Sequence, residues 1–387
     1  MSKMNTVRGF QVKPQIWYGI GSLKKLADFN FTKVCIVTDE GMVKFGLLDM
    51  VTDVLDKAGV TYHIFDDVKP NPTSDIVEKG VAHMLTQRPQ ALIALGGGSS
   101  IDTAKGIIYY TNNFKQIFLD PQLVQNPHFI AIPTTAGTGS EVTDYAVITD
   151  VDTGTKIPLS ESMMMPDTAI LDPKLIESVP AGATAATGMD VLTHAIEAYV
   201  STGNNPFSRC YASKATELVF KSLKACYDDG HDLESKASMQ IASTMAGIAF
   251  NSAGLGMAHA IAHTIGAQYH LPHGLACAIA LPYVIAYNGI DERAEYLYGR
   301  LLHALGIHKD EGRTASATFV RMIVKLMKSM NLPICLDESR SDTSDYDEVR
   351  STLIKKAMAD ATLKTNPVQP SEEDMGKILD LVCHGVF

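Results

Sequence analysis

The sequence predicts an α/β domain with a parallel β-sheet, followed by a domain built only of helices. Up to about residue 180, short runs rich in Val, Ile and Leu alternate with helical stretches, which is typical of a parallel sheet covered on both faces. Beyond that point strand-like runs largely disappear and long segments carry helical periodicity. The length of 387 residues also favours two domains. We place the boundary near residues 180–186 and expect domains at 1–183 and 184–387.

The individual elements follow from these patterns in chain order. Four apolar runs are expected to form the parallel sheet, at 34–37, 60–65, 91–95 and 129–132. A helix is expected at 47–58, and 145–159 is expected to form a β-hairpin turning at Asp152-Thr153-Gly154. The second half is expected to hold long helices at 185–200, 206–227, 233–252 and 313–330.

Composition and charge exclude several classes of protein. The 33 basic residues against 43 acidic ones give a net charge of −10 and form no cluster, so we expect no nucleic-acid partner. The longest apolar run, 275–287, is interrupted by Pro282 and is too short to span a bilayer. The first residues lack the apolar stretch of a signal peptide, and the six cysteines are dispersed without a CxxC pair, as in reduced proteins. We therefore expect a cytoplasmic protein without a membrane segment.

Two glycine-rich loops follow predicted strands. The first contains Gly97, Gly98 and Ser99, and its glycines let backbone N–H groups approach a phosphate at the start of the next helix. The second contains three threonines whose hydroxyls can bond ribose, phosphate or nicotinamide: Thr134, Thr135 and Thr138. Ligands of α/β sheets bind at the carboxyl ends of strands, so the two loops together favour a dinucleotide. The alternatives are a tight strand-to-helix turn and helix caps.

Asp39 closes the first predicted strand. A carboxylate there can accept a hydrogen bond from the ribose 2′-OH and would repel a 2′-phosphate, which favours NAD over NADP. In the usual dinucleotide fingerprint, however, the acidic residue follows the glycines by about 20 residues. Here it precedes them, and the alternative is that Asp39 caps the next helix.

A metal site is indicated by Asp190 and His194 together with a second cluster. The pair stands four residues apart, which places both side chains on one side of a helix. Four of the twelve histidines fall within fifteen residues of apolar sequence: His259, His263, His270 and His273. Spacing alone leaves the ligands open, since His259 and His263 can bind as a pair, or one can bind while the other acts as an acid or base. One oxygen and three nitrogens suit Fe²⁺, Zn²⁺, Mn²⁺ or Co²⁺, and Cys277 is a rival ligand that would favour zinc.

These motifs resemble a known family over nearly the whole chain. The segments GGGSSIDTAK, PTTAGTGSEVT, GMDVLTHAIEAYVS and HAIAH…PHG are similar to those of the iron-dependent (group III) alcohol dehydrogenases. Within that family, residues 165–173 and 359–367 most resemble the 1-propanol dehydrogenases of propanediol utilisation and the ethanol dehydrogenases of ethanolamine utilisation. The resemblance implies a Rossmann-like sheet domain and a helical domain, in the architecture shared with dehydroquinate synthase.

The resemblance also implies roles for individual residues. The implied metal ligands are Asp190, His194, His259 and His273. His263 would lie beside the metal and take part in proton relay. The first glycine loop would hold the NAD pyrophosphate, Asp39 the adenosine ribose, and the second loop other parts of the cofactor. Phe250 would line the substrate pocket, and Thr362 stands where some relatives have a cysteine near the substrate.

The activity implied is interconversion of short-chain aldehydes, such as propionaldehyde and acetaldehyde, with primary alcohols. In the reaction implied by the resemblance, Fe²⁺ polarises the carbonyl and the nicotinamide transfers hydride. A dehydroquinate synthase-like lyase is the alternative, but 250–272 contains none of the Lys or Arg that its substrate would need. Another alternative is a non-catalytic assembly subunit. A homodimer or larger oligomer is expected, and a bacterial microcompartment is a candidate location.

Overall fold

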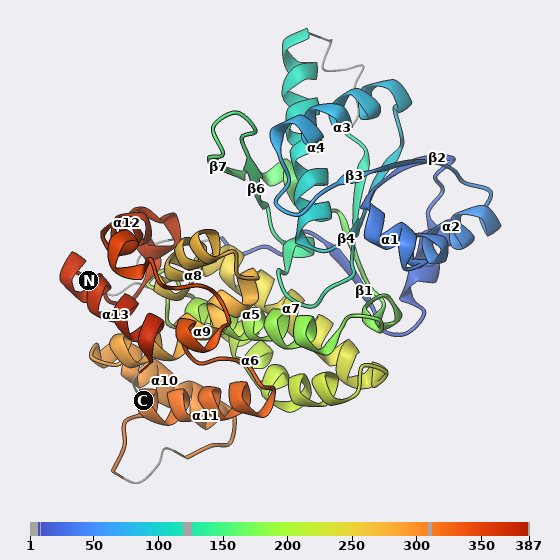
Figure 1. Cartoon of the computed structure of the whole chain (residues 1–387). Coiled ribbons are helices and arrows are strands. Elements are labelled where there is room, and N and C mark those ends of the chain that lie inside the picture. Colours follow the sequence, from blue (N-terminus) through green and yellow to red (C-terminus); the bar gives the residue numbers. More distant parts are fainter. Residues whose placement is uncertain (1–6, 8, 119–125, 309–311, 386–387) are drawn as a thin grey trace.

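A six-stranded parallel sheet forms the first part of the molecule (Figure 1). The computed structural model describes residues 7, 9–118, 126–308 and 312–385. The strand order is β1-β8-β5-β4-β2-β3. The strands are β1 (Gln15–Tyr18), β2 (Lys33–Asp39), β3 (Thr61–Val68), β4 (Ala91–Gly96), β5 (His128–Pro133) and β8 (Thr168–Leu171). The four predicted strands are therefore confirmed as β2, β3, β4 and β5.

Strands β1 and β8 were not predicted. Each has only four residues, and prolines stand close to their ends at Pro14, Pro166 and Pro173. Such short runs have too few residues to show the hydrophobic pattern by which a strand is recognised in a sequence. Their pairing is set by tertiary contact instead, because β8 lies between β1 and β5 and is wholly buried.

Helices cover both faces of the sheet, as predicted. Alternate side chains of β2 show this, because Val34 and Ile36 pack into one apolar core whereas Cys35 and Val37 pack into another. The first core is shared with α2 (Leu47–Lys57) and the second with α3 (Ser74–Gln87) and α4 (Gly98–Phe118). A five-residue helix, α1 (Glu40–Lys44), follows β2 directly.

The predicted hairpin forms from β6 (Tyr145–Thr149) and β7 (Lys156–Ser160), which pair antiparallel as a separate two-stranded sheet. Lys105 of α4 anchors its start. The buried ammonium donates to Ser140 Oγ (2.7 Å), Thr143 Oγ1 (2.9 Å) and the Tyr145 carbonyl (2.8 Å). Burial lowers the pKa of Lys105 to about 8, against the opposing attraction of carboxylates that include Asp102. The hairpin and the loop before it are thus held to α4.

The second part of the chain is helical, as predicted (Figure 1). It has its own apolar core. Its helices are α5 (Ala181–Val200), α6 (Pro206–Asp228), α7 (Leu233–Ala253), α8 (Met257–Tyr269), α9 (His273–Asn288), α10 (Glu292–Ala304), α11 (Ala315–Ser329), α12 (Tyr346–Ala359) and α13 (Glu372–His384). The four predicted helices correspond to α5, α6, α7 and α11. Helix α5 begins at Ala181, within the 180–186 region of the predicted boundary, and the division at 183/184 stays a prediction.

Within the described ranges, no individual helix has both the length and the apolar character that a membrane crossing requires. Among the same residues, one pair of helices, α9 and α10, bent by 120° between them, has the required length and composition when the two are taken together.

Candidate metal and cofactor site

The predicted cofactor residues lie at the carboxyl ends of three neighbouring strands. Strands β2, β4 and β5 are adjacent in the sheet. Asp39 ends the first of them, the first glycine loop follows the second, and the threonine loop follows the third. The structure therefore brings together segments that are about 40 to 100 residues apart in the chain. This is the edge at which open α/β sheets bind ligands.

The two glycine-rich loops touch each other. A Cβ added at Gly98 would come within 2.8 Å of the Thr138 side chain, and one at Gly97 within 3.5 Å of Thr135. Gly96 has a φ of +148°, a conformation that side chains disfavour. Helix α4 begins at Gly98 and directs its free N–H groups towards this junction. Such a helix start suits a phosphate or another anion.

Asp39 faces the same junction but already has hydrogen-bond partners. Its Oδ1 accepts from the backbone N–H groups of Gly41 (2.8 Å) and Met42 (3.3 Å), so it caps α1 as the alternative interpretation held. Its Oδ2 accepts from Ser100 Oγ at 3.2 Å, which links it to the start of α4. The carboxylate is only partly buried. It therefore lies where a ribose held beside the glycine loop would meet it.

The predicted metal ligands converge from three helices. Asp190 and His194 lie on α5, His259 on α8, and His273 begins α9. From Asp190 Oδ1 the distances are 3.9 Å to His194 Nδ1, 3.7 Å to His259 Nε2 and 3.5 Å to His273 Nε2. Four ligands about 2.1 Å from a tetrahedral ion would lie roughly 3.4 Å apart. The three separations from Asp190 Oδ1 are close to that value.

Unpartnered buried atoms at this point fit a cation. Asp190 Oδ1, His194 Nδ1 and His259 Nε2 are all buried and have no hydrogen-bond partner among the described residues. A buried polar atom without a partner is costly, so three of them facing one point indicate a missing common partner. Burial lowers the pKa of His194 to about 3, which keeps the imidazole in the neutral form that binds metals. The His273 side chain is 42% exposed, which leaves one side of the cluster accessible.

Glu197 supports His259 from behind, a role that sequence reasoning missed. His259 Nδ1 donates to Glu197 Oε2 at 2.6 Å, so Nε2 is left facing Asp190. The Glu197 carboxylate is 3% exposed and also accepts from the backbone N–H groups of Gly256 (3.0 Å) and Ala258 (2.6 Å). One side chain of α5 therefore both orients a candidate ligand and caps the helix that carries it. The signal was available, because 190, 194 and 197 share one face of a helix.

Asn366 fixes the same helix start from the C-terminal segment. Its Oδ1 accepts from the backbone N–H of Met257 at 3.1 Å, and its Nδ2 donates to Asn288 Oδ1 at 2.8 Å. The Gly137 backbone of the threonine loop lies close enough to the His194 ring to act on its pKa, which it raises against the larger effect of burial. The candidate ligands are therefore held by both the helical part and the sheet part of the chain.

His263 lies one turn beyond His259 on α8 and is paired with Asp360, to which sequence reasoning assigned no role. Its Nδ1 donates to Asp360 Oδ2 at 2.8 Å, and its ring stacks on that of His273 with centroids 5.4 Å apart. The Asp360 carboxylate is held in turn by the backbone N–H (2.8 Å) and hydroxyl (2.6 Å) of Thr362. The His263 side chain is 37% exposed. Its Nε2 is therefore the nitrogen left to exchange protons.

Of the remaining predicted residues, Phe250 lies at the cluster and His270 does not take part in it. The Phe250 ring stacks on that of His194 with centroids 4.5 Å apart. His270 ends α8 in a left-handed conformation and is exposed. Thr362 is linked to the site through its hydrogen bonds to Asp360.

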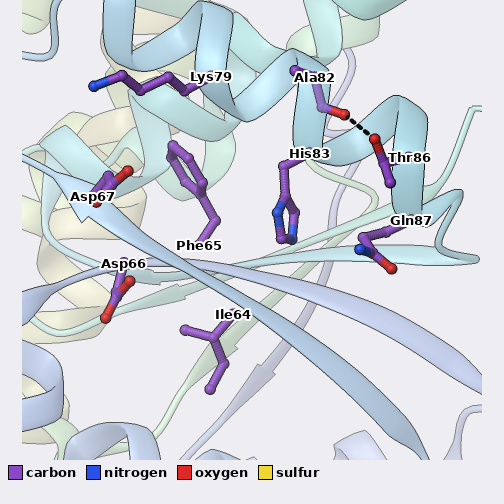
Figure 2. Close-up of a pocket in the computed structure, with 9 residues that line it drawn as sticks. All are labelled: Ile64, Phe65, Asp66, Asp67, Lys79, Ala82, His83, Thr86 and Gln87. Carbon is purple, nitrogen blue, oxygen red and sulfur yellow. Dashed lines mark hydrogen bonds between the residues drawn. The ribbon is translucent and has the colours of Figure 1, made fainter.

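A separate hollow of about 440 Å³ lies between β3 and α3, at the outer edge of the sheet (Figure 2). Its lining includes Phe65 and Asp67 of β3 and Lys79 and His83 of α3. None of its lining residues is a predicted metal or cofactor residue. It therefore adds nothing to the candidate site.

Two family profiles match the chain. The profile described as iron-containing alcohol dehydrogenase matches residues 14–173, and that described as Fe-containing alcohol dehydrogenase family, C-terminal, matches residues 184–382. A 1-propanol dehydrogenase of Citrobacter freundii is 39% identical over 97% of this chain and 99% of its own. An NADPH-dependent butanol dehydrogenase of Clostridium saccharobutylicum is 36% identical over 97% and 98%.

A solved structure shares the whole fold. The sulfoacetaldehyde reductase of Bifidobacterium kashiwanohense, in complex with NAD⁺, matches with a TM-score of 0.87 and 26% identity over 98% of this chain and 99% of its own. These matches favour the predicted dehydrogenase over the lyase and the non-catalytic subunit. The resemblance seen in the sequence is confirmed, and the chain belongs to the iron-containing alcohol dehydrogenase family, as an oxidoreductase.

Proposed function

We propose that the protein interconverts short-chain aldehydes and primary alcohols, using NAD(H) and a divalent iron ion held by Asp190, His194, His259 and His273. The observation that carries this proposal is the convergence of these four side chains, three of which have an unpartnered buried atom. A site that keeps one accessible side is typical of catalytic rather than structural metal sites.

The proposed NAD site is the junction of the two glycine-rich loops. Gly97, Gly98 and Ser99 at the start of α4 would hold the pyrophosphate, because helix N–H groups and the helix dipole favour anions. The threonine hydroxyls at 134, 135 and 138 would contact the rest of the cofactor. The contact between the Gly137 backbone and His194 supports placing the nicotinamide end near the metal ligands.

The bound groups would supply Lewis-acid polarisation of the carbonyl and the hydride itself. His263 would supply or accept the proton at Nε2, because Asp360 holds its Nδ1. Thr362 keeps Asp360 in place and so fixes the ring. Phe250 places an apolar ring against His194, which excludes water and favours an aliphatic substrate tail. These roles make His263 a proposed catalytic residue and Asp360 a positioning residue.

The first test is direct. Protein purified anaerobically and loaded with Fe²⁺ is expected to oxidise NADH when propionaldehyde or acetaldehyde is added. The reaction is monitored by the loss of absorbance of the reduced cofactor. The apoprotein is expected to be inactive, because nothing else at the site polarises a carbonyl. An iron-loaded protein that reduces neither aldehyde, and oxidises neither alcohol with NAD⁺, would contradict the proposed substrate class.

The second test addresses Asp39. The wild type is expected to use NADH in preference to NADPH, because the carboxylate repels a 2′-phosphate. A like-charge contact near a protein surface costs about 1–4 kcal/mol, so Asp39→Gly should raise the NADPH to NADH ratio of kcat/KM by roughly tenfold or more. The lost cap costs only a few tenths of a kcal/mol when glycine replaces it. Asp39→Asn removes the charge but keeps a capping oxygen, and so serves as the matched variant that isolates the effect of charge. An unchanged ratio in both variants would remove this role from Asp39.

A homodimer or larger assembly in the cytoplasm, with packaging in a bacterial microcompartment, belongs to the same proposal. This part of the proposal is supported by the similarity to a 1-propanol dehydrogenase.

A further inference from the structure

A fifth potential ligand lies at the proposed iron site. Cys277 stands one turn after His273 on α9, and its Sγ is 3.6 Å from His273 Nε2. The thiol is fully buried. Donor atoms of Asp190, His259, His273 and Cys277 all lie within 4.8 Å of one another. The site therefore offers two alternative sets of four donors, which differ in whether His194 or Cys277 completes them.

The spacing of the sulfur matches coordination. With about 2.3 Å to sulfur and about 2.1 Å to nitrogen, two ligands of a tetrahedral ion lie roughly 3.6 Å apart. That is the observed separation of Cys277 Sγ and His273 Nε2. The alternative donor, His194 Nδ1, is the farthest of the three nitrogens from Asp190, at 3.9 Å. The sulfur-containing set is thus one whose donor atoms all lie within 4.8 Å of one another.

We propose that Cys277 binds the metal only when the ion prefers sulfur ligands, and that it thereby allows such ions to occupy this site. This inference rests on the proposed function, because it uses the same site. Zn²⁺ and Co²⁺ would be bound by Asp190, His259, His273 and the Cys277 thiolate, and the thiol proton would leave to solvent as the metal–sulfur bond forms. Fe²⁺ would keep the set of one carboxylate and three imidazoles. Cys277 would then decide how strongly zinc competes with iron.

A second cluster has similar spacing but carries no such inference. Asp337, Cys383 and His384 also bring three donors together. Asp337 is already paired with His384 at 3.0 Å and accepts a hydrogen bond from Thr343 at 3.0 Å. None of the three residues has a buried side-chain atom without a partner, whereas the cluster at Cys277 has two such atoms, Asp190 Oδ1 and His259 Nε2.

Cobalt substitution tests the inference without measuring activity. Co²⁺ added anaerobically to the metal-free full-length protein is expected to give the near-ultraviolet absorption of a thiolate-to-cobalt charge transfer. Cys277→Ser should abolish this band. Cys226→Ser, at another buried cysteine, is the matched control and should keep it. His194→Ala should also keep it, because His194 lies outside the sulfur-containing set.

Affinity gives an independent measurement. In competition with a chelator, Cys277→Ser is expected to weaken Zn²⁺ binding by at least the roughly 10- to 100-fold that loss of an outer partner of a ligand costs, with a smaller change for Fe²⁺. One bound Co²⁺ per chain without a sulfur band, and unchanged Zn²⁺ affinity in the variant, would overturn this inference alone. Failure of the wild type to bind Co²⁺, Zn²⁺ or Fe²⁺ would overturn the proposed metal site together with it.

Discussion

Replacing His259 with alanine is expected to strip the protein of its metal and to lower aldehyde reduction to background. Its Nε2 is 3.7 Å from Asp190 Oδ1, and its side chain is 1% exposed, so water cannot easily take its place as a ligand. A Lewis-acid ion supplies several kcal/mol to the transition state, and each 1.4 kcal/mol is about tenfold in rate. We therefore expect kcat/KM to fall roughly a thousandfold or more.

The measurement combines elemental analysis of the anaerobically purified variant with its rate of NADH oxidation. His270→Asn is the matched control, because it changes an exposed histidine at the end of the same helix to a residue that tolerates its left-handed backbone. Circular dichroism of both variants verifies that α8 remains folded. If the His259 variant kept both metal and rate, the assignment of ligands would be wrong, whatever the family relationship.

The fold was largely predictable because its strongest signals are local. Buried parallel strands read as continuous apolar runs, and the runs at β2, β4 and β5 are long enough to stand out. Helix α5 carries two candidate ligands four residues apart, so its metal-binding face was visible in the sequence. The strands that escaped prediction, β1 and β8, have only four residues each and depend on their neighbours for their conformation.

The support of the site was not predictable in the same way. His259 and Glu197 are 62 residues apart, His263 and Asp360 are 97 apart, and Met257 and Asn366 are 109 apart. No spacing rule covers such separations, because the packing of α5, α8 and the C-terminal segment creates them. Cys277 shows a further limit. Its nearness to the histidines was visible in the sequence, but its alignment with their donor atoms required the structure.

Changing Glu197 is expected to have the second largest effect, although Glu197 is not a proposed ligand. Glu197→Ala would leave the His259 Nδ1 hydrogen and the N–H groups of Gly256 and Ala258 without acceptors in a buried place. Each such group costs about 1–3 kcal/mol, so we expect the free energy of unfolding of the metal-free protein to fall by about 3 kcal/mol or more. Urea unfolding of the apoprotein measures this loss independently of metal.

Glu197→Gln separates charge from shape. Glutamine keeps one acceptor oxygen but removes the negative charge. Its amide N–H groups would also face the N–H donors that the carboxylate accepts from. In the proposed site, the buried carboxylates of Asp190 and Glu197 would together balance the two charges of a divalent ion, whereas the glutamine variant would leave one positive charge unbalanced there. We expect metal affinity to fall roughly 10- to 100-fold, the usual cost of losing the partner of a metal-bound histidine. Glu217→Gln, at a partly exposed position on α6 paired with Lys214 and Lys221, is the control and should change neither affinity nor stability measurably. Wild-type metal affinity in Glu197→Gln would show that the carboxylate only caps α8, and that the electrostatic balance of the site comes from elsewhere.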